Sequence, residues 1–290
     1  MILKASDLRH SYGKIESLRG LSFEIEKAGV VALLGPNGAG KSTLSRILSG
    51  VLTPTAGHLE LMGCPSHSIE ARRRVGITPQ EVDFPKHLRV EEILNLVRSH
   101  YDNSRPLEAL LESFQLQGLR RRYASELSGG QKRRLAVACT FAGPAKLVVL
   151  DEPTTGLDIE SRRVLWENVR EFSRHGGSVL LTTHYLDEVE ALAGRVLVLH
   201  QGQLLYDGGV QELKSRIGFR RVRFQSEDFE GKLGGYQFER ASNDFQLVCP
   251  DSDVVVRLLI DKSVPFKNLE VTSVSLEDAF LALVQRDSKL

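Results

Sequence analysis

The chain has 290 residues, with 38 lysines and arginines, 37 aspartates and glutamates, and a formal net charge of +1. This balance excludes recognition of nucleic acid or of an acidic membrane through bulk charge. The length allows one large domain and one small domain, and the apolar and charged fractions are those of an ordinary globular protein.

Neither the cysteines nor the hydropathy indicate secretion or membrane insertion. Cys64, Cys139 and Cys249 are scattered without C-x-x-C spacing, which favours reduced thiols in a cytosolic protein. The amino terminus has no apolar core long enough for a secretory signal, and no apolar run approaches the roughly 18 residues that span a bilayer. If the protein serves a membrane process, we expect a partner to supply the spanning helices.

The amino-terminal region is predicted to form strands and turns. Residues 2–5 and 18–25 are predicted strands, the second because its apolar residues alternate, and residues 8–13 lie between them. Tyr12 in this connection precedes a glycine and could stack its ring on a nucleobase, because stacking needs only a π-face. A partly buried strand tyrosine is the alternative, and the local pattern alone favours it.

A phosphate-binding loop is predicted between a buried strand and a helix. Residues 30–34 are apolar, and Leu44, Ile47 and Leu48 follow the loop at helical spacing. Strand, glycine loop and helix are the context that this motif requires. The loop fits G-x-x-x-x-G-K-[ST] with Gly35, Pro36, Asn37, Gly38, Ala39, Gly40, Lys41, Ser42 and Thr43.

The chemistry of phosphate binding explains the residue types of this loop. Glycines allow the backbone to turn tightly and to point its N–H groups at phosphate oxygens, and the helix adds the positive end of its dipole. Lys41 can place an ammonium on the β- and γ-phosphates, and Ser42 can offer a hydroxyl to Mg²⁺. The sequence therefore predicts binding of a nucleoside triphosphate.

The next predicted elements are a short strand and a helical insertion. Residues 75–80 are predicted to form a strand that ends in a loop at Gln80, which by itself is interpreted as an exposed loop glutamine. Residues 90–117 have helical periodicity with two apolar stripes. We expect a small helical insertion there.

Three basic clusters raise the possibility of RNA contact. They lack interleaved aromatic residues and lie in a neutral chain, which favours solvated helix faces or a protein contact instead. No nucleic-acid partner is therefore expected. The clusters are residues 72–74, 120–122 and 132–134.

Residues 127–131, Leu-Ser-Gly-Gly-Gln, open a predicted helix. Ser128 with Gln131 three residues later forms a capping-box pattern, so one interpretation is simply a helix start. Gly129 and Gly130 expose backbone N–H groups at that start, as a second anion site would require. From the residues alone both interpretations stay open.

Two further apolar strands are predicted to end in polar residues. Residues 147–150 precede Asp151 and Glu152, which a buried strand would deliver to the carboxyl edge of an open α/β sheet. One carboxylate can hold Mg²⁺ while its neighbour orients or deprotonates water. Residues 178–183 lead to His184, whose imidazole can hydrogen-bond a γ-phosphate.

In order and spacing, these motifs resemble those of the nucleotide-binding subunit of ABC transporters. Residues 127–131 match the family's LSGGQ signature, and residues 147–152 match its Walker B strand. Residues 156–158 match the D-loop, Gln80 falls at the Q-loop, and His184 matches the switch histidine. Because the signature is highly specific to ABC ATPases, the resemblance predicts membership of that family.

The resemblance implies a fold and a division into domains. The implied fold is α/β: a P-loop ABC ATPase with a mixed sheet core, a helical subdomain and a small α+β C-terminal domain. Residues 1–218 are expected to form the nucleotide-binding domain, with its helical subdomain at about residues 80–145. Residues 219–290 are expected to form the small accessory domain.

The resemblance also implies the roles of single residues in binding ATP and Mg²⁺. Two copies are expected to dimerise head to tail, with each ATP between one phosphate loop and the opposite signature. Glu152 is implied as general base, His184 as γ-phosphate sensor, and Gln80, Ser42 and Asp151 as the metal-binding set. Gln80 is also placed beside the attacking water. The implied ATP contacts are Tyr12, which reverses the local interpretation, the loop residues Gly35, Pro36, Asn37, Gly38, Ala39, Gly40, Lys41, Ser42 and Thr43, the signature residues Ser128, Gly129 and Gly130, and Asp158, which bridges the dimer interface.

The carboxyl-terminal tail bears on the direction of transport. Residues 275–280, Ser-Leu-Glu-Asp-Ala-Phe, resemble the tail of type-2 ABC exporter ATPases, which serve drug and polysaccharide exporters. The same residues form a capping box that predicts a helix over residues 275–284. The alternative is a small accessory domain that stabilises the ATPase dimer, a role expected in either case.

We therefore expect a peripheral ATPase subunit on the cytoplasmic, inner face of the cell membrane that powers an integral membrane permease. Export rests on the tail alone, so import is an alternative. A non-transport ABC ATPase of translation or DNA repair is a second alternative, although the chain has one set of motifs and no long heptad run. A GTPase or a small-molecule kinase would not explain residues 127–131.

Overall fold

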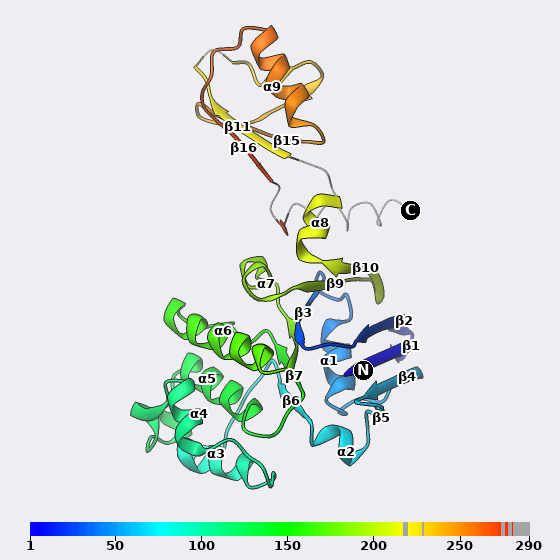
Figure 1. Cartoon of the computed structure of the whole chain (residues 1–290), viewed down its shortest axis with the longest axis vertical. Helices are drawn as coiled ribbons and strands as arrows, with labels where there is room; N and C mark the ends of the chain where they lie inside the picture. Colours follow the sequence, from blue (N-terminus) through cyan, green and yellow to red (C-terminus); the bar gives the residue numbers. More distant parts are fainter. Residues whose placement is uncertain (217–219, 228, 274–275, 278–279, 281–290) are drawn as a thin grey trace. The chain divides into compact units, whose positions relative to one another are not determined.

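The computed structural model contains two compact units, Met1–Asp207 and Gly208–Leu290. The division precedes residue 218 because helix α8 (Val210–Arg216) groups with the second unit. Figure 1 shows the path of the chain from its amino terminus. The structure describes residues 1–216, 220–227, 229–273, 276–277 and 280.

A six-stranded sheet forms the centre of the first unit, in the order β10-β9-β3-β8-β7-β6. Its strands are β3 (Gly29–Leu34), β6 (Val75–Thr78), β7 (Leu147–Asp151), β8 (Ser178–Thr182), β9 (Arg195–His200) and β10 (Gln203–Gly209). β3 pairs in parallel with β8 and β9, and β7 pairs in parallel with β6 and β8. The carboxyl ends of parallel strands meet at one edge, so the loops after β3, β6, β7 and β8 converge there.

An antiparallel sheet of order β2-β1-β4-β5 accompanies the central sheet. Its strands are β1 (Leu3–Tyr12), β2 (Ile15–Ile25), β4 (Ala56–Leu61) and β5 (Cys64–Pro65). The first strand is longer than the predicted residues 2–5, because residues 8–12 continue β1. Asp7 has a φ of 47° and the pairing register shifts between Ala5 and Leu8, so a bulge interrupts the alternation that marks a strand.

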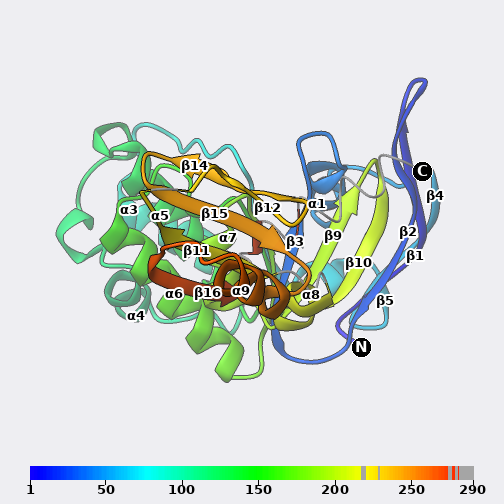
Figure 2. The same ribbon diagram turned by 90° about the horizontal axis from the view of Figure 1, so that it is seen from above.

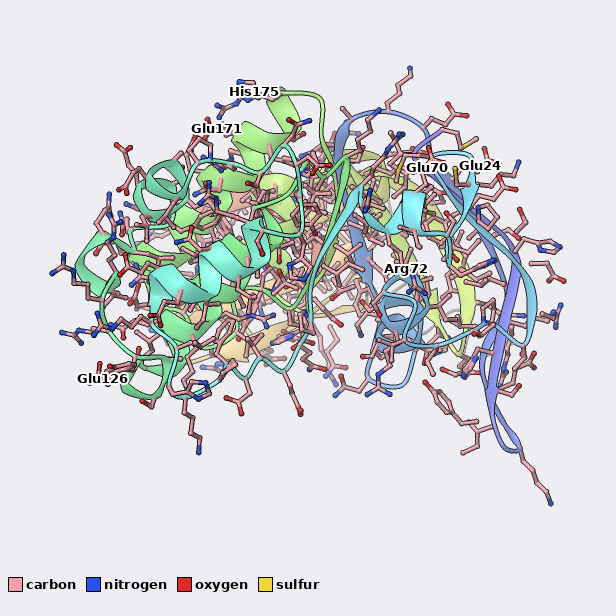
Figure 3. The ribbon with its side chains drawn as sticks, turned by 90° about the horizontal axis from the view of Figure 1, so that it is seen from below. Glu24, Glu70, Arg72, Glu126, Glu171 and His175 are labelled. Carbon is pink, nitrogen blue, oxygen red and sulfur yellow. The ribbon has the colours of Figure 1, made fainter. Side chains whose placement is uncertain are left out.

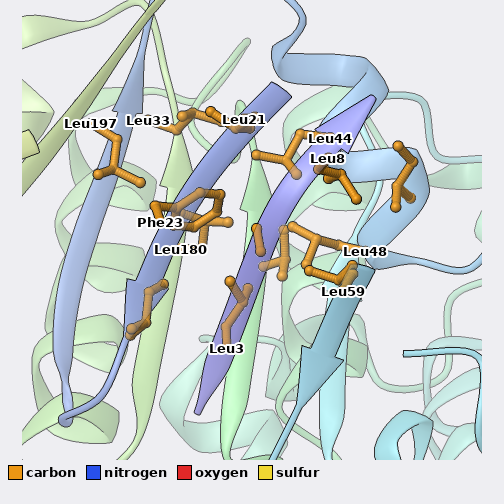
Figure 4. Packing of buried hydrophobic residues seen from close by; sticks show 14 of the residues in the cluster. Leu3, Leu8, Leu21, Phe23, Leu33, Leu44, Leu48, Leu59, Leu180 and Leu197 are labelled. Carbon is orange, nitrogen blue, oxygen red and sulfur yellow. The ribbon is translucent and has the colours of Figure 1, made fainter. Parts of the chain in front are cut away.

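One hydrophobic core lies between the antiparallel sheet, helix α1 (Lys41–Leu48) and one face of the central sheet. Alternate residues of a strand point to opposite faces, and β8 follows this rule. Leu180 belongs to this core, whereas Val179 and Leu181 belong to the core on the other face. Figure 4 shows side chains of the core between the two sheets, among them Leu3, Leu8, Leu21, Phe23, Leu33, Leu44, Leu48, Leu59, Leu180 and Leu197.

Helices form the second core on the opposite face of the central sheet. In Figure 2 the antiparallel strands lie at one side of the first unit and helices α3 to α6 at the other. The helices predicted within residues 90–117 are present as α3 and α4. The helices and 3-10 turns of this unit are α2 (Ile69–Arg72), α3 (Val90–Arg98), α4 (Leu107–Ser113), η1 (Gln117–Leu119), η2 (Ala124–Glu126), α5 (Gly129–Thr140), α6 (Ile159–Arg174) and α7 (Leu186–Leu192).

The basic clusters differ in their surroundings. Figure 3 shows Glu70 and Arg72 on α2, where both are exposed. Arg74, two residues after the end of α2, pairs with Glu70 at 3.3 Å. Arg120 pairs with two glutamates of neighbouring helices. The interpretation as a solvated helix face is wrong for Arg133, which is buried, whereas Lys132 and Arg134 are partly exposed.

The second unit contains a four-stranded sheet of order β14-β15-β11-β16, with helix α9 packed against it. The ring of Phe224 stacks on that of Phe245 and contacts those of Phe229 and Phe238, which makes the core largely aromatic. Besides α8, its elements are β11 (Arg220–Gln225), β12 (Lys232–Leu233), β13 (Tyr236–Gln237), β14 (Glu239–Ala241), β15 (Asp244–Cys249), α9 (Ser252–Asp261) and β16 (Lys267–Ser273).

The predicted carboxyl-terminal helix falls mostly beyond the part of the chain that the structure describes. Ser275, Asp278, Ala279 and residues 281–284 are all outside it. The tail motif Ser-Leu-Glu-Asp-Ala-Phe is therefore supported by sequence alone.

Candidate active site

The phosphate loop follows β3 and its backbone requires glycine at several positions. Gly38 and Gly40 have φ angles of 81° and 106°, in the left-handed region that favours glycine. A Cβ at Gly35 would lie 2.4 Å from the carbonyl oxygen of Leu199, so a side chain there would clash with the backbone of β9. The predicted strand, glycine loop and helix are all present.

Lys41 folds back over the loop that precedes it. Its Nζ donates hydrogen bonds to the carbonyl oxygens of Gly35, at 2.6 Å, and Pro36, at 3.0 Å. Burial lowers the pKa of Lys41, while the carboxylates of Glu152 and Asp151 act to raise it. The ammonium therefore lies within the loop, with two acids near enough to influence it electrostatically.

The two hydroxyls that follow Lys41 differ in their availability. The Oγ1 of Thr43 is buried and hydrogen-bonded to the Oγ of Ser17 on β2, at 2.8 Å. Ser42 is exposed in the first turn of α1. Ser42 is therefore the hydroxyl that can reach a ligand, whereas Thr43 ties the helix to the antiparallel sheet.

Asp151 and Glu152 stand at the carboxyl end of β7, as the apolar lead-in predicted. Asp151 is buried, and the hydroxyl of Thr182 on β8 donates to its Oδ1. Glu152 has a φ of 46°, a left-handed conformation that costs energy in a residue with a side chain. Such a conformation persists only where the surroundings hold it, and it is most frequent at functional sites.

The carboxylate of Glu152 brings together the three predicted catalytic residues. Gln80, in the loop after β6, donates from Nε2 to one carboxylate oxygen at 3.3 Å. The Nδ1 of His184, beyond β8, lies 3.4 Å from the other oxygen. Three residues far apart in the sequence thus converge because their strands are neighbours in the sheet.

The signature residues form the start of helix α5. Ser128 is its N-cap: its Oγ accepts from the backbone N–H of Gln131, and the Gln131 side chain accepts from the backbone N–H of Ser128. The predicted capping box is therefore present. Gly129 is exposed and Gly130 half-buried, so the helix presents backbone N–H groups of the kind that bind anions.

Gly129 and Gly130 of the signature line a cavity together with Gln80 and Glu152 of the same chain. This cavity of about 280 Å³ separates the start of α5 from the loops after β6 and β7. None of residues 35–43, all of which the structure describes, lines it. Its walls are Gln80, Val82, Gly129, Gly130, Arg133, Glu152, Thr155 and Gly156.

Tyr12 and Asp158 are the remaining residues of the predicted ATP-binding set. Tyr12 ends β1 and is 44% exposed, with its ring edge-on to that of His10 at 4.7 Å between centroids. The side chain of Asp158 caps α6 by accepting from the backbone N–H of Ser161 at 2.7 Å. This hydrogen bond lowers the pKa of Asp158 and so favours its carboxylate form.

Sequence reasoning missed one residue that connects these parts. Arg133, on α5, is 7% exposed and directs its guanidinium at the backbone of the loops after β6 and β7. The sequence signal for its burial is that Arg133 shares a predicted helix with apolar residues. Because Lys132 and Arg134 flank it, the segment resembles a solvated basic cluster instead.

A second missed residue, Glu188 on α7, is fully buried. Its carboxylate accepts hydrogen bonds from Thr154 Oγ1 at 3.2 Å and Trp166 Nε1 at 3.3 Å. Burial raises the pKa of Glu188, against the lowering effect of hydrogen bonds that include one from Thr183. The carboxyl group joins the segment after Glu152 to α6 and to the helix after His184.

The raised pKa of Glu188 predicts a pH-dependent contribution to stability. The folded protein holds this proton more tightly than the unfolded chain, so stability falls as pH rises above the ordinary glutamate pKa of 4.5. Glu188→Gln stays neutral, so its thermal unfolding midpoint should rise relative to that of wild type as the pH increases from 4.5 through the raised pKa of Glu188. The exposed Glu171→Gln should show no such trend, and a pH-independent difference for Glu188→Gln would contradict the prediction.

Comparisons with known proteins agree with this architecture. A family model described as ABC transporter matches residues 18–155. Nod factor export ATP-binding protein I of Rhizobium etli is 35% identical over 97% of this chain and 93% of its own length. A solved ATP-binding subunit of an ABC transporter is 28% identical with a TM-score of 0.71, covering 75% of this chain and 94% of its own.

The first unit has the fold of a P-loop ATPase domain. The chain belongs to the ABC transporter family and is an ABC ATPase. A dimeric ATP-binding cassette solved with ADP and Pi has the same fold, with 21% identity and a TM-score of 0.65 over 72% of this chain and 98% of its own. In the part of the chain that the structure describes, the helices are too short or too polar to cross a membrane.

Proposed function

We propose that this chain is the ATP-hydrolysing subunit of an ABC exporter and drives an integral membrane permease. The observation that carries the proposal is the convergence of Gln80, Glu152 and His184 at the sheet edge that also carries the phosphate loop. Export is supported by the similarity, over nearly the whole chain, to relatives described as export ATP-binding proteins.

We propose that two copies pair head to tail and share two ATP molecules. Gly129 and Gly130 of the signature line a cavity together with Glu152 of their own chain, and none of residues 35–43 lines that cavity. A helix start that binds anions would then serve the γ-phosphate held by the other copy. The unit Met1–Asp207 would carry the ATP site, and the second unit would be an accessory domain that stabilises the pair.

The residues of the site divide the work of hydrolysis. Tyr12 stacks on the adenine, while the loop N–H groups and Lys41 hold the β- and γ-phosphates. Glu152 accepts a proton from the attacking water as the water oxygen bonds to the γ-phosphorus and the bond to the ADP oxygen breaks. His184 hydrogen-bonds the γ-phosphate, and Gln80 orients the water.

The donor set fits Mg²⁺, which prefers oxygen ligands. The buried Asp151 carboxylate is held in place by Thr182, and the Ser42 hydroxyl is exposed at the start of α1. We propose that Asp151, Ser42 and Gln80 hold the ion. When bound, Mg²⁺ neutralises charge on the transferring phosphate.

The proposed location is the cytoplasmic, inner face of the cell membrane, in a complex with the permease. The full chain with an affinity tag should co-purify from detergent-solubilised membranes with an integral membrane protein. ATP hydrolysis by that complex should depend on added Mg²⁺ and stop with EDTA. Co-purification with ribosomes or DNA would favour a non-transport ABC ATPase, and a solute-binding protein in the complex would favour import.

A further inference from the structure

Arg133 donates five hydrogen bonds to backbone carbonyl oxygens next to the catalytic residues. Its Nη1 donates to the carbonyl oxygens of Pro79, at 2.6 Å, and Gln80, at 3.0 Å. Its Nη2 and Nε donate to three consecutive carbonyl oxygens, those of Asp151, Glu152, at 2.8 Å, and Pro153, at 3.3 Å. One buried guanidinium therefore holds the backbones of two loops that belong to different strands.

This arrangement suits arginine and no other residue. Arginine presents five N–H donors in a rigid plane, so it can span two loops at once, whereas lysine offers three donors from a single atom. Burial of a charged group is unfavourable, and the hydrogen bonds from Arg133 to carbonyl oxygens offset this free energy. Burial lowers the pKa of Arg133, and the nearby carboxylates of Asp151, Glu152 and Glu188 oppose that effect.

We propose that Arg133 is a positioning residue for ATP hydrolysis, which acts by fixing Glu152 and Gln80 relative to each other. The three carbonyls that it holds, those of Asp151 at the end of β7 and of the next two residues, bracket the left-handed backbone of Glu152, whose φ is 46°. The two that it holds after β6 fix the loop from which Gln80 reaches the Glu152 carboxylate. The hydrogen bonds of Arg133 end on backbone carbonyl oxygens and reach neither the phosphate loop nor the Glu152 carboxylate.

Arg133 also lies on the helix that begins with the signature. Residues 128–130 form the first turn of α5, and Arg133 follows about one turn later on the same rigid helix. The proposed function includes contact of the signature with the γ-phosphate held by a second copy. Through Arg133, that contact would directly affect the position of Glu152. Arg133 then couples closure of the ATPase pair to alignment of the base.

The test uses the full chain and measures kcat for ATP hydrolysis and the Kd for ATP separately. Arg133→Lys and Arg133→Gln should each lower kcat by about 100-fold, the loss expected from a misplacement of about 1 Å. The Kd should change by less than about threefold, the split that marks an interaction needed only at the transition state. Lys132→Gln, which removes a charge from the same turn of α5, should leave both values near wild type.

A double-mutant cycle with Glu152→Gln separates positioning from a general structural role. If Arg133 acts through Glu152, replacing it by lysine in the Glu152→Gln background should change the residual rate by less than about threefold. Equal losses in both backgrounds, a proportional loss of ATP binding, or an unchanged kcat in Arg133→Lys would each overturn the proposal. If Arg133→Gln does not fold, Arg133→Lys decides alone.

The outcomes also distinguish this inference from the proposed function. A wild-type chain that hydrolyses no ATP would contradict the proposed function itself. Normal wild-type hydrolysis together with normal hydrolysis by Arg133→Lys would contradict only the role of Arg133.

Discussion

Replacing Glu152 by glutamine should lower kcat by at least about 100-fold, because general base catalysis typically contributes 10²- to 10⁴-fold. Glutamine has the same shape, and its amide oxygen can still accept the hydrogen bond that Gln80 Nε2 donates to the carboxylate at 3.3 Å. Its amide cannot accept the proton of the attacking water. ATP binding should persist, and the closed pair of subunits should accumulate because hydrolysis no longer opens it.

The measurement combines steady-state hydrolysis with the molecular mass of the chain in ATP. Glu152→Gln should elute as a dimer with ATP and as a monomer with ADP. Glu171→Gln is the matched control, since Glu171 is an exposed acid at the far end of α6. Undiminished steady-state hydrolysis by Glu152→Gln would refute the assignment of the base.

Replacing Lys41 by methionine should weaken ATP binding by about 10- to 100-fold, because a hydrogen bond to a charged group contributes about 1.5–3 kcal/mol. In the structure the ammonium bonds to the carbonyls of Gly35 and Pro36, and phosphate oxygens would replace these partners. Methionine keeps the apolar stem that packs in the buried site and removes only the charge.

Equilibrium binding of a fluorescent ATP analogue measures this loss. Lys27→Met removes an exposed charge just before the amino end of β3, at the other end of the strand from the phosphate loop, and should bind ATP normally. Wild-type affinity in Lys41→Met would show that the loop does not bind phosphate. A loss shared equally by the Lys27 variant would indicate a bulk charge effect instead.

Local sequence patterns predicted the elements that carry the site. The apolar run at residues 30–34 predicted β3, and the run at residues 147–150 placed Asp151 and Glu152 at a strand end. Buried parallel strands read as continuous apolar segments, so their ends are easily located. The first strand was underestimated because the bulge at Asp7 breaks the alternation on which the prediction depends.

Local sequence patterns could not predict contacts between residues that are distant in the sequence. Gln80 reads as an ordinary loop glutamine, yet it bonds to Glu152 because β6 and β7 are neighbours in the sheet. Arg133 reads as part of a solvated basic cluster, yet tertiary packing buries it against two loops. Glu188 likewise reads as a surface helix residue, and only the fold encloses it.

The shared ATP site is the central claim, and mixed dimers test it most directly. The complexes are purified through a different tag on each ATPase copy. In the first arrangement, one copy carries Lys41→Met and the other carries Ser128→Arg. If each site combines one loop with the opposite signature, both defects fall in one site, and the other site should keep hydrolysing ATP. In the second arrangement one copy carries both substitutions beside a wild-type copy, so both sites are damaged and activity should be lost. Activity confined to the second arrangement would contradict the account, because it would place loop and signature of each site in the same chain.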